Sequence, residues 1–197
     1  MMQTWMSYKH WVMVFCLSAL ILLLFACQKN KVDLPSIIEH KTVIQPIDWS
    51  NIAVDKVIVY KAKRELQLLQ HGQVIKSYKM RLGFNPVGHK LMEGDGKTPE
   101  GIYTLDWRNP ESKFYKSLHI SYPNAQDQAQ AKSRNVSAGG DIMIHGSANY
   151  LGAEKGSLFY AYLPQGDWTQ GCIAVSNQDM DELWHQIKDH TVIEILP

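Results

Sequence analysis

Residues 57–82, VIVYKAKRELQLLQHGQVIKSYKMRL, carry the pattern that decides the fold. The stretch opens with Val57–Tyr60, a run of residue types that favour β-strands. Two further segments, Glu65–Leu69 and Val74–Leu82, flank His71-Gly72, and the second of them alternates along its length. Two extended segments around a Gly-containing turn predict a β-hairpin.

The extended pattern continues along the chain and is interrupted by one clear helical segment. Ser176 and Asp179 match a helix-capping pattern, and apolar residues then follow at helical spacing. Residues 94–101 are predicted to form a loop, and residues 124–140 a surface loop or a short helix. About seven or eight short strands with one C-terminal amphipathic helix predict a mainly β sandwich or barrel. The further strands are predicted at residues 102–107, 118–122, 141–144, 172–175 and 191–196.

The composition fits one ordinary globular domain. Of the 197 residues, 45% are hydrophobic and 20% are charged, which excludes a collagen-like, low-complexity or fully disordered chain. The 20 basic residues nearly balance the 19 acidic ones, so charge gives no reason to expect a nucleic-acid partner. We expect a single domain over residues 52–197.

The N-terminal segment has the pattern of an export signal. Residues 11–26, WVMVFCLSALILLLFA, are almost wholly apolar, but the run is short for a membrane-spanning helix, which needs about 20 residues. Ala26-Cys27 at the end of the run resembles the lipobox of bacterial lipoproteins, in which the Cys is lipidated and becomes the new N-terminus. We therefore predict a signal peptide at residues 1–26, lipidation of Cys27 and a tether at residues 27–51.

An uncleaved N-terminal anchor helix is the alternative to the lipoprotein signal. Both interpretations export the domain to the periplasm and hold it at a membrane. The outer membrane is preferred over the inner, because Gln28 is not the Asp that enterobacterial sorting rules associate with inner-membrane retention.

Only one of the three cysteines remains free in the exported domain. Cys16 lies in the signal and Cys27 is the predicted lipid site, which leaves Cys172. Backbone N–H groups at a turn such as the one at Gly171 can hold an oxyanion. A thiol becomes nucleophilic as the thiolate, and the imidazole of His145 is a candidate to take its proton. The pair suits acyl transfer through a thioester; a buried Cys that only packs is the alternative.

Three segments together resemble the L,D-transpeptidase family of the YkuD type. Ile144-His145-Gly146 and Thr169-Gln170-Gly171-Cys172-Ile173 are similar to the His-Gly and Ser/Thr-x-Gly-Cys-Ile motifs of that family. Residues 94–101, GDGKTPEG, are similar to its Gly-Asp-x-x-Thr-Pro-x-Gly stretch. The resemblance covers residues 54–197 and implies a single YkuD-like β-sandwich or barrel domain.

The resemblance implies a role for each matching position. Cys172 corresponds to the nucleophile and His145 to the general base. Gly171, with the Cys172 amide, corresponds to the backbone that holds the oxyanion, and Gly146 to the glycine whose backbone helps to orient the imidazole. Many members carry an Arg two residues after the Cys, whereas this chain has Ala174 there.

The long interval between the two catalytic motifs is expected to form a lid over the cleft at residues 147–167. Four side chains are expected to line the substrate cleft: Trp168, Thr169, Gln170 and Tyr160. Packing of the aromatic residues under the loop, or as a core anchor for Trp168, is the alternative. No metal site is expected, since His185 and His190 lack an evident third ligand, and the family implies no cofactor.

The resemblance implies a peptidoglycan L,D-transpeptidase. Cys172 would attack the carbonyl of the L-centre of meso-diaminopimelate in a stem tetrapeptide, D-Ala would leave, and an amine would resolve the thioester. An amine from another stem peptide gives a 3-3 crosslink, and one from a protein lysine attaches a protein to murein. The implied partners are peptidoglycan stem peptides, a murein-linked lipoprotein and the membrane that holds the N-terminal anchor.

Three alternatives stay open. Water in place of the amine would make the protein an L,D-carboxypeptidase, or a hydrolase that releases a murein-linked protein. An inactive lipid-anchored murein-binding module is the second, because Ala174 replaces the Arg. A sortase also places His before Cys, but its Thr-Leu-x-Thr-Cys stretch and downstream Arg are absent here.

Overall fold

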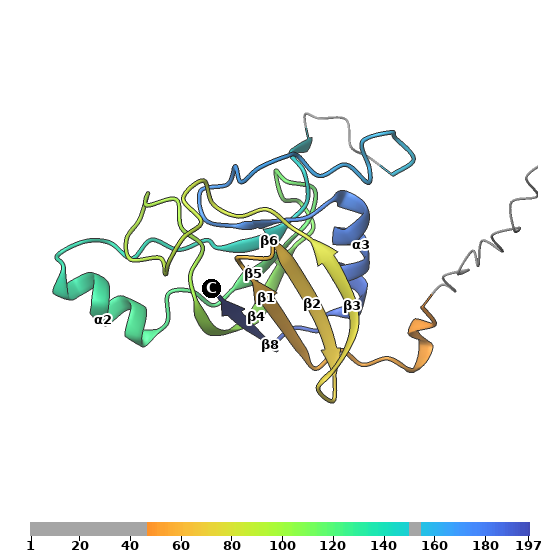
Figure 1. The fold of residues 1–197 in the computed structure, drawn as a ribbon, viewed down its shortest axis with the longest axis horizontal. Helices are drawn as coiled ribbons and strands as arrows, with labels where there is room; N and C mark the ends of the chain where they lie inside the picture. Colours follow the sequence, from red (N-terminus) through yellow and green to blue (C-terminus); the bar gives the residue numbers. More distant parts are fainter. Residues whose placement is uncertain (1–46, 150–154) are drawn as a thin grey trace, which may run out of the picture. The chain divides into compact units, whose positions relative to one another are not determined.

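One eight-stranded mixed β-sheet carries the fold (Figure 1). The computed structural model describes residues 47–149 and 155–197, so the predicted signal peptide, Cys27 and most of the predicted tether lie outside the described residues. The strand order across the sheet is β3-β2-β1-β8-β4-β5-β6-β7. The strands are β1 (Lys56–Tyr60), β2 (Glu65–Gln70), β3 (Gln73–Lys79), β4 (Gly101–Asn109), β5 (Ser117–Ile120), β6 (Met143–His145), β7 (Ile173–Ala174) and β8 (Thr191–Leu196).

The hairpin predicted around His71-Gly72 is confirmed. Strands β2 and β3 pair antiparallel from Glu65 opposite Lys79 to Gln70 opposite Gln73. His71 and Gly72 have φ angles of 50° and 76°. Two successive residues with positive φ give the type of two-residue turn whose twist matches that of the flanking strands.

The last strand lies inside the sheet rather than at its edge. β8 pairs in parallel with β1, from Lys56 opposite Val192 to Tyr60 opposite Leu196. On its other side β8 pairs antiparallel with β4, where Gly101 lies opposite Ile195. β8 therefore joins the N-terminal hairpin to the strands that carry the predicted site.

The sheet curls until its two ends meet. Arg81, just after β3, and Ala174 of β7 exchange two backbone N–H···O hydrogen bonds of 2.8 Å. A second bridge joins Gly83 to Thr169. These contacts link the segment that follows β3 to the strand at the other end of the sheet. The predicted mainly β domain is thus confirmed, as a single curled half-barrel.

The hydrophobic core lies along one face of the curled sheet. Buried and less buried residues alternate in β1 and β8, as expected for strands with one face in the core. Burying each large aliphatic side chain contributes about 1.5–3 kcal/mol, so this face supplies much of the stability. The inward-facing residues include Val57, Val59, Leu66, Leu68, Leu105, Ile144, Ile173, Ile193 and Ile195.

Helix α3 (Asn177–Gln186) begins at the predicted cap. The Ser176 hydroxyl accepts a hydrogen bond from the Asp179 amide at 3.1 Å. Met180 and Leu183 are fully buried and Ile187 nearly so, which confirms the predicted apolar stripe. The helix packs on β5 and β6, and it therefore supports the strand that ends at His145.

The second helix, α2 (Ala125–Ser133), lies in the segment predicted as a loop or short helix, on the far side of the sheet from α3 (Figure 1). Asn124 and Asp127 form a capping box at its start.

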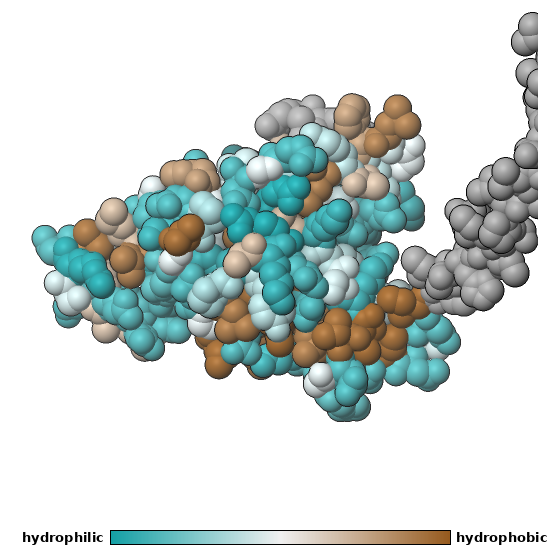
Figure 2. All heavy atoms as spheres, viewed as in Figure 1, coloured by the Kyte–Doolittle hydropathy of each residue, from teal (hydrophilic) through white to brown (hydrophobic). Residues whose placement is uncertain are grey.

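The surface seen in Figure 2 is mostly hydrophilic, with a band of hydrophobic residues along its lower edge. Within the described residues, no helix has the length and apolar character needed to cross a bilayer.

The structured unit includes the end of the predicted tether. A short 3-10 helix, η1 (Trp49–Asn51), is capped by the side chain of Asp48. Trp49 and Ile52 are partly buried against the core.

Candidate active site

Adjacent parallel strands place Cys172 and His145 near each other. In β6 and β7, Ile144 lies opposite Ile173, and His145 opposite Ala174. Cys172 immediately precedes β7, and its Sγ lies 3.4 Å from the backbone amide of Met143. Side chains alternate along strands, so His145 and Cys172 extend from the face opposite to the two core isoleucines. The two motifs, 27 residues apart in sequence, thus meet on one face of the sheet.

A backbone carbonyl sets the tautomer of His145. Its Nδ1 lies 2.7 Å from the carbonyl oxygen of Gly146. A carbonyl oxygen only accepts hydrogen bonds, so Nδ1 carries the proton and Nε2 of the neutral ring is the basic nitrogen. The ring of His145 is therefore oriented by the backbone of the residue that follows it.

Two aromatic rings cover His145. The Phe114 ring centroid lies 4.6 Å from that of the imidazole, and the Trp168 ring meets it edge-on at 5.6 Å. Only 2% of His145 is exposed. Burial lowers the pKa of His145 to about 4, against a weaker opposing effect of the Gly146 hydrogen bond. The imidazole is therefore neutral at neutral pH and able to accept a proton.

The Cys172 thiol rests on the backbone of residues 141–143. The Met143 amide donates to Sγ, and the S–H donates to the Asp141 carbonyl at 3.5 Å. Burial raises the pKa of the thiol, whereas the Met143 amide lowers it. Within the described residues, the thiol and the imidazole do not hydrogen-bond each other. The site holds a neutral thiol and a neutral base rather than a preformed ion pair.

Thr169 builds the turn that presents Cys172. Its hydroxyl donates to the Cys172 carbonyl at 2.7 Å and accepts from the Gly171 amide at 3.1 Å. Gly171 has a φ of 135°, and a Cβ there would lie 2.7 Å from the Lys97 carbonyl oxygen. Only glycine satisfies both the backbone angle and the close approach of the residue 94–101 loop.

The Gly171 amide is already occupied by Thr169. In this structure that amide donates within the turn, and its role toward an oxyanion stays a prediction. The Cys172 amide remains the candidate donor from this turn. Gly146, the other predicted backbone residue, packs against the Asn177 side chain, whose Oδ1 accepts from the Ser147 amide at 2.7 Å.

A cavity of about 380 Å³ opens beside the thiol. We call it the cysteine cavity. Gln170, predicted to line the substrate cleft, is exposed and lies in this lining. A larger cavity of about 750 Å³ lies elsewhere, between α2 and the end of β8. The cysteine cavity is lined by Lys90, Glu93, Gly94, Gly139, Gly140, Asp141, Ile142, Gln170 and Cys172.

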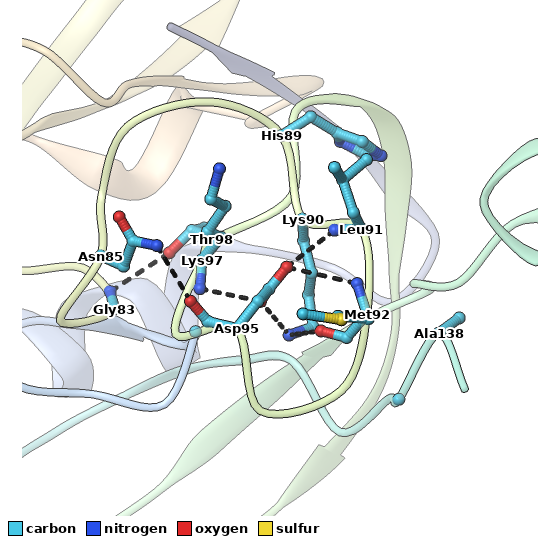
Figure 3. A network of polar contacts seen from close by, with 12 residues as sticks. Gly83, Asn85, His89, Lys90, Leu91, Met92, Asp95, Lys97, Thr98 and Ala138 are labelled. Atoms are coloured by element: carbon cyan, nitrogen blue, oxygen red, sulfur yellow. Dashed lines mark hydrogen bonds and ion pairs between the residues drawn. The ribbon is translucent and has the colours of Figure 1, made fainter. Parts of the chain in front are cut away.

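Asp95 organises the loop that forms one wall of the cysteine cavity (Figure 3). Its carboxylate accepts from the amides of Leu91, Met92 and Lys97 at 2.8–3.2 Å, and from the Lys90 ammonium at 2.8 Å. Burial alone would raise the pKa of Asp95, but these hydrogen bonds outweigh it and lower the pKa. Asp95 is thus a turn-forming residue that carries a stable negative charge.

Two of the predicted cleft residues have other roles in the structure. Thr169 is buried within the turn. Its hydroxyl both donates to and accepts from backbone groups of the same turn, so neither function is left for a substrate. The Tyr160 hydroxyl hydrogen-bonds Asp181 of α3, which also accepts from the Tyr115 hydroxyl at 3.0 Å. Tyr160 therefore ties the 155–167 segment to α3 instead of lining the cysteine cavity.

Trp168 packs against His145 and is not among the residues that line the cysteine cavity. It is half-buried and packs against Phe114, 5.8 Å between ring centroids, as well as against His145. The predicted lid at residues 147–167 is described except for residues 150–154. Phe114 was not predicted, because an isolated aromatic residue in a loop gives no functional signal.

Ala174, where the family resemblance leads one to expect Arg two residues beyond the Cys, is fully buried. Arg81 lies opposite it in the sheet, but the Arg81 guanidinium donates to the carbonyls of Pro164 and Met80. Neither residue lines the cysteine cavity. Among the described residues, no cluster of three or more His, Cys, Asp or Glu side chains is arranged to hold a metal ion.

Comparison with known families identifies the domain. The family model of the YkuD L,D-transpeptidase catalytic domain matches residues 55–195. The chain belongs to the YkuD family. Strands β1 to β8 fall within the match almost completely, so the curled half-barrel is the YkuD catalytic domain of this protein.

A curated relative extends this comparison. The chain is 31% identical over 133 residues to the protein named "Putative L,D-transpeptidase YafK" of Escherichia coli K12, covering 64% of this chain and 44% of that protein. The chain thus spans less than half the length of this curated relative.

Two solved structures share the fold of this YkuD domain. The helical cell shape determining protein Pgp2 of Campylobacter jejuni is 25% identical, with a TM-score of 0.53 over 72% of this chain and 47% of that chain. Bd1075 of Bdellovibrio bacteriovorus is 26% identical, with a TM-score of 0.51 over 73% of this chain and 48% of that chain.

Proposed function

We propose that this YkuD domain is a cysteine L,D-transpeptidase that acts on peptidoglycan stem tetrapeptides. Cys172 is the nucleophile, His145 the general base, and no metal or organic cofactor takes part. Family membership supports the reaction class and a peptidoglycan substrate. The observation that carries the residue assignment is the hydrogen bond from His145 Nδ1 to the Gly146 carbonyl, which leaves Nε2 as a free base on the face that carries Cys172.

The proposed first step forms a thioester. Nε2 of His145 takes the proton of the Cys172 thiol as the sulfur attacks the carbonyl at the L-centre of meso-diaminopimelate. The carbon–nitrogen bond to D-Ala breaks, and the imidazolium returns its proton to the departing amine. The rings of Phe114 and Trp168 cover the imidazole and keep water away from it during this transfer.

The second step sets the outcome of the reaction. An acceptor amine attacks the thioester, His145 takes a proton from it, and the thiol of Cys172 is regenerated. An amine from a second stem gives a 3-3 crosslink, and an amine from a protein lysine attaches that protein to murein. Attack by water instead yields a tripeptide, or releases a murein-linked protein. Two separate half-reactions predict ping-pong kinetics.

Trapping of the acyl-enzyme tests this proposal. Incubation with a carbapenem, followed by intact-mass spectrometry, is expected to show one adduct on the wild-type protein and none on Cys172→Ala. His145→Asn is expected to slow adduct formation strongly, whereas His185→Asn, at an exposed histidine on α3, serves as the matched control. A folded wild-type protein that forms no adduct would instead support a murein-binding module without activity.

Muropeptide analysis separates the outcomes of the second step. Reaction with purified sacculi and chromatographic separation of the fragments is expected to give 3-3 crosslinked dimers, or a lysine-linked peptide when a protein acceptor is supplied. Tripeptides without crosslinks would assign the protein as an L,D-carboxypeptidase or hydrolase. Crosslinks that still form with Cys172→Ala would exclude the mechanism altogether.

We also propose that the domain is exported and tethered to the outer membrane by lipid on Cys27. The apolar run at residues 11–26 and the Ala26-Cys27 junction support this proposal. Metabolic labelling with a palmitate analogue is expected to mark the wild-type protein and not Cys27→Ala. Retention of an unprocessed chain of full mass would indicate an anchor helix, and membrane fractionation would distinguish the two membranes.

A further inference from the structure

The cysteine cavity has a mixed charge that the catalytic steps do not use. Its lining includes the basic residue Lys90 and the acidic residues Glu93 and Asp141. Like charges on a ligand and its site repel, and opposite charges attract. A lining with both signs therefore disfavours a ligand group that carries a single charge and favours one that carries an anion and a cation side by side.

Lys90 has an unused hydrogen-bonding capacity in this cavity. Only 3% of its side chain is exposed, and its Nζ donates to Asp95 at 2.8 Å and to the Met92 carbonyl at 3.1 Å (Figure 3). An ammonium group has three N–H donors, and within the described residues the third has no partner. A buried donor without an acceptor is costly, and because Lys90 belongs to the lining, a ligand in the cavity can supply that acceptor.

Both signs of charge act on the sulfur itself. Burial has the largest effect and raises the pKa of Cys172; the Asp141 carboxylate raises it further, and the Lys90 ammonium lowers it. The two charged groups, both in the cavity lining, therefore lie within electrostatic range of the thiol. A substrate group between them would be next to the carbonyl that Cys172 attacks.

The position of Lys90 also bears on the missing arginine. Ala174 offers no cation, and the Arg81 guanidinium opposite it donates to backbone carbonyls outside the cysteine cavity. Among the described lysines and arginines, Lys90 is the one that lines this cavity. Asp95 holds it in place, and three backbone amides share that carboxylate, so Asp95 does not fully neutralise the ammonium.

We propose that the cysteine cavity is a subsite for a free amino-acid end group, in which one carbon carries both a carboxylate and an ammonium. Lys90 binds the carboxylate, and Asp141 with Glu93 binds the ammonium. This inference rests on the proposed function: the side chain of meso-diaminopimelate in a stem tetrapeptide ends in such a group. The carboxylates of the glutamate and D-Ala residues of that peptide have no free amine beside them.

Binding to modified peptides tests the subsite without any turnover. The full chain carrying Cys172→Ala is titrated calorimetrically with the tetrapeptide, with three forms in which one carboxylate is a carboxamide, and with a form acetylated on the diaminopimelate amine. Amidation or acetylation at the end group is expected to weaken binding about 10–100-fold, the effect of losing one charge-assisted hydrogen bond. Equal effects of all three amidations, or none at the end group, would overturn the proposal.

A Lys90→Gln substitution in the same background identifies the residue. It is expected to weaken binding of the unmodified peptide by a similar factor, with no further loss for the end-group amide. Lys63→Gln, at an exposed lysine, is the matched control. If Lys90→Gln weakens both peptides equally, Lys90 has only a structural role and its assignment fails. If this variant does not fold, the modified peptides still decide the subsite with Lys90 intact.

The two proposals fail in different ways. A wild-type protein that forms no acyl-enzyme but whose Cys172→Ala variant distinguishes the end-group forms would retain the subsite and lose the enzymatic function. An active enzyme that binds all forms equally would retain the function and lose the subsite.

Discussion

The His145 ring donates from Nδ1 to the carbonyl of its own neighbour, Gly146, across 2.7 Å. Cysteine acyl-transfer enzymes often use a carboxylate or amide side chain to orient the base. Here the backbone does so, and the contact adds no negative charge that would stabilise an imidazolium. Burial, with no such charge beside the ring, lowers the pKa of His145, so the base is weak and neutral. This has measurable consequences for stability and for reactivity.

Stability is expected to fall with acid through the titration of His145. Its pKa is about 4 in the fold and 6.5 as an ordinary histidine, because burial disfavours the charged ring. The unfolded chain therefore binds the proton first, and stability present above pH 6.5 is lost as the pH falls toward 4. The loss attributable to this group is about 3 kcal/mol. Urea unfolding at pH 7 and pH 4 measures it.

His145→Asn should remove that part of the pH dependence, and His185→Asn should keep it. The comparison uses the difference between variants, since carboxylates titrate over the same range. An unchanged dependence in His145→Asn would show that the imidazole is not held neutral.

Alkylation of Cys172 by iodoacetamide is expected to accelerate steadily as the pH rises above neutrality. Burial raises the pKa of this thiol, and only the thiolate reacts. No plateau of reactivity should occur at about pH 5–7, where a thiolate–imidazolium pair would give one. His145→Asn should leave the shape of the profile unchanged; a plateau that the substitution abolishes would contradict the neutral pair described above.

Replacement of Thr169 is expected to lower activity through the turn rather than through substrate binding. Thr169→Val removes the hydroxyl that links the Gly171 amide to the Cys172 carbonyl. Loss of these hydrogen bonds should cost about 1–3 kcal/mol of unfolding free energy. We expect kcat to fall while KM changes little, and Thr169→Ser to restore activity. A large rise in KM alone would instead show that Thr169 contacts the substrate in the cleft.

Tyr160→Phe tests the role that the structure gives to this hydroxyl, which is to bind Asp181. The hydroxyl binds Asp181 of α3, so its loss is expected to destabilise the fold by about 0.5–1.5 kcal/mol without changing KM. Thermal unfolding and steady-state kinetics on the same preparation provide both quantities. Tyr115→Phe, which loses the other tyrosine contact to Asp181, should behave in the same way.

Local sequence patterns predicted the elements whose signals are local. The turn at His71-Gly72, the Ser176 cap and the apolar stripe of α3 each depend on residues a few positions apart, and the structure contains all three. Helix α2 was only one of two alternatives because its buried residues are just Asp127 and Ala131, so it has no apolar stripe to detect.

Local patterns could not predict which segments pair when they lie far apart in the sequence. The place of β8 between β1 and β4 depends on pairings of residues more than 80 positions apart. The proposed catalytic pair was predicted because its motifs resemble a family, but the residues that surround the pair were not predicted. Lys90 and Phe114 gave no signal, because a single lysine or aromatic residue has meaning only once the fold places it. Thr169 was assigned to the cleft because it is close to Cys172 in sequence, and Tyr160 because it is an aromatic residue of the predicted lid.

The position of β8 makes the domain indivisible. Without residues 191–196, the hairpin with β1 and the strands β4 to β7 would lose their shared neighbour, and each fragment would expose an unpaired strand edge. A chain truncated before Thr191 should therefore aggregate instead of retaining a partial site. Attempts to split the domain into complementing halves between β1 and β4 should fail, because both halves need β8. Insertion of a tag at the His71-Gly72 turn should leave the sheet intact.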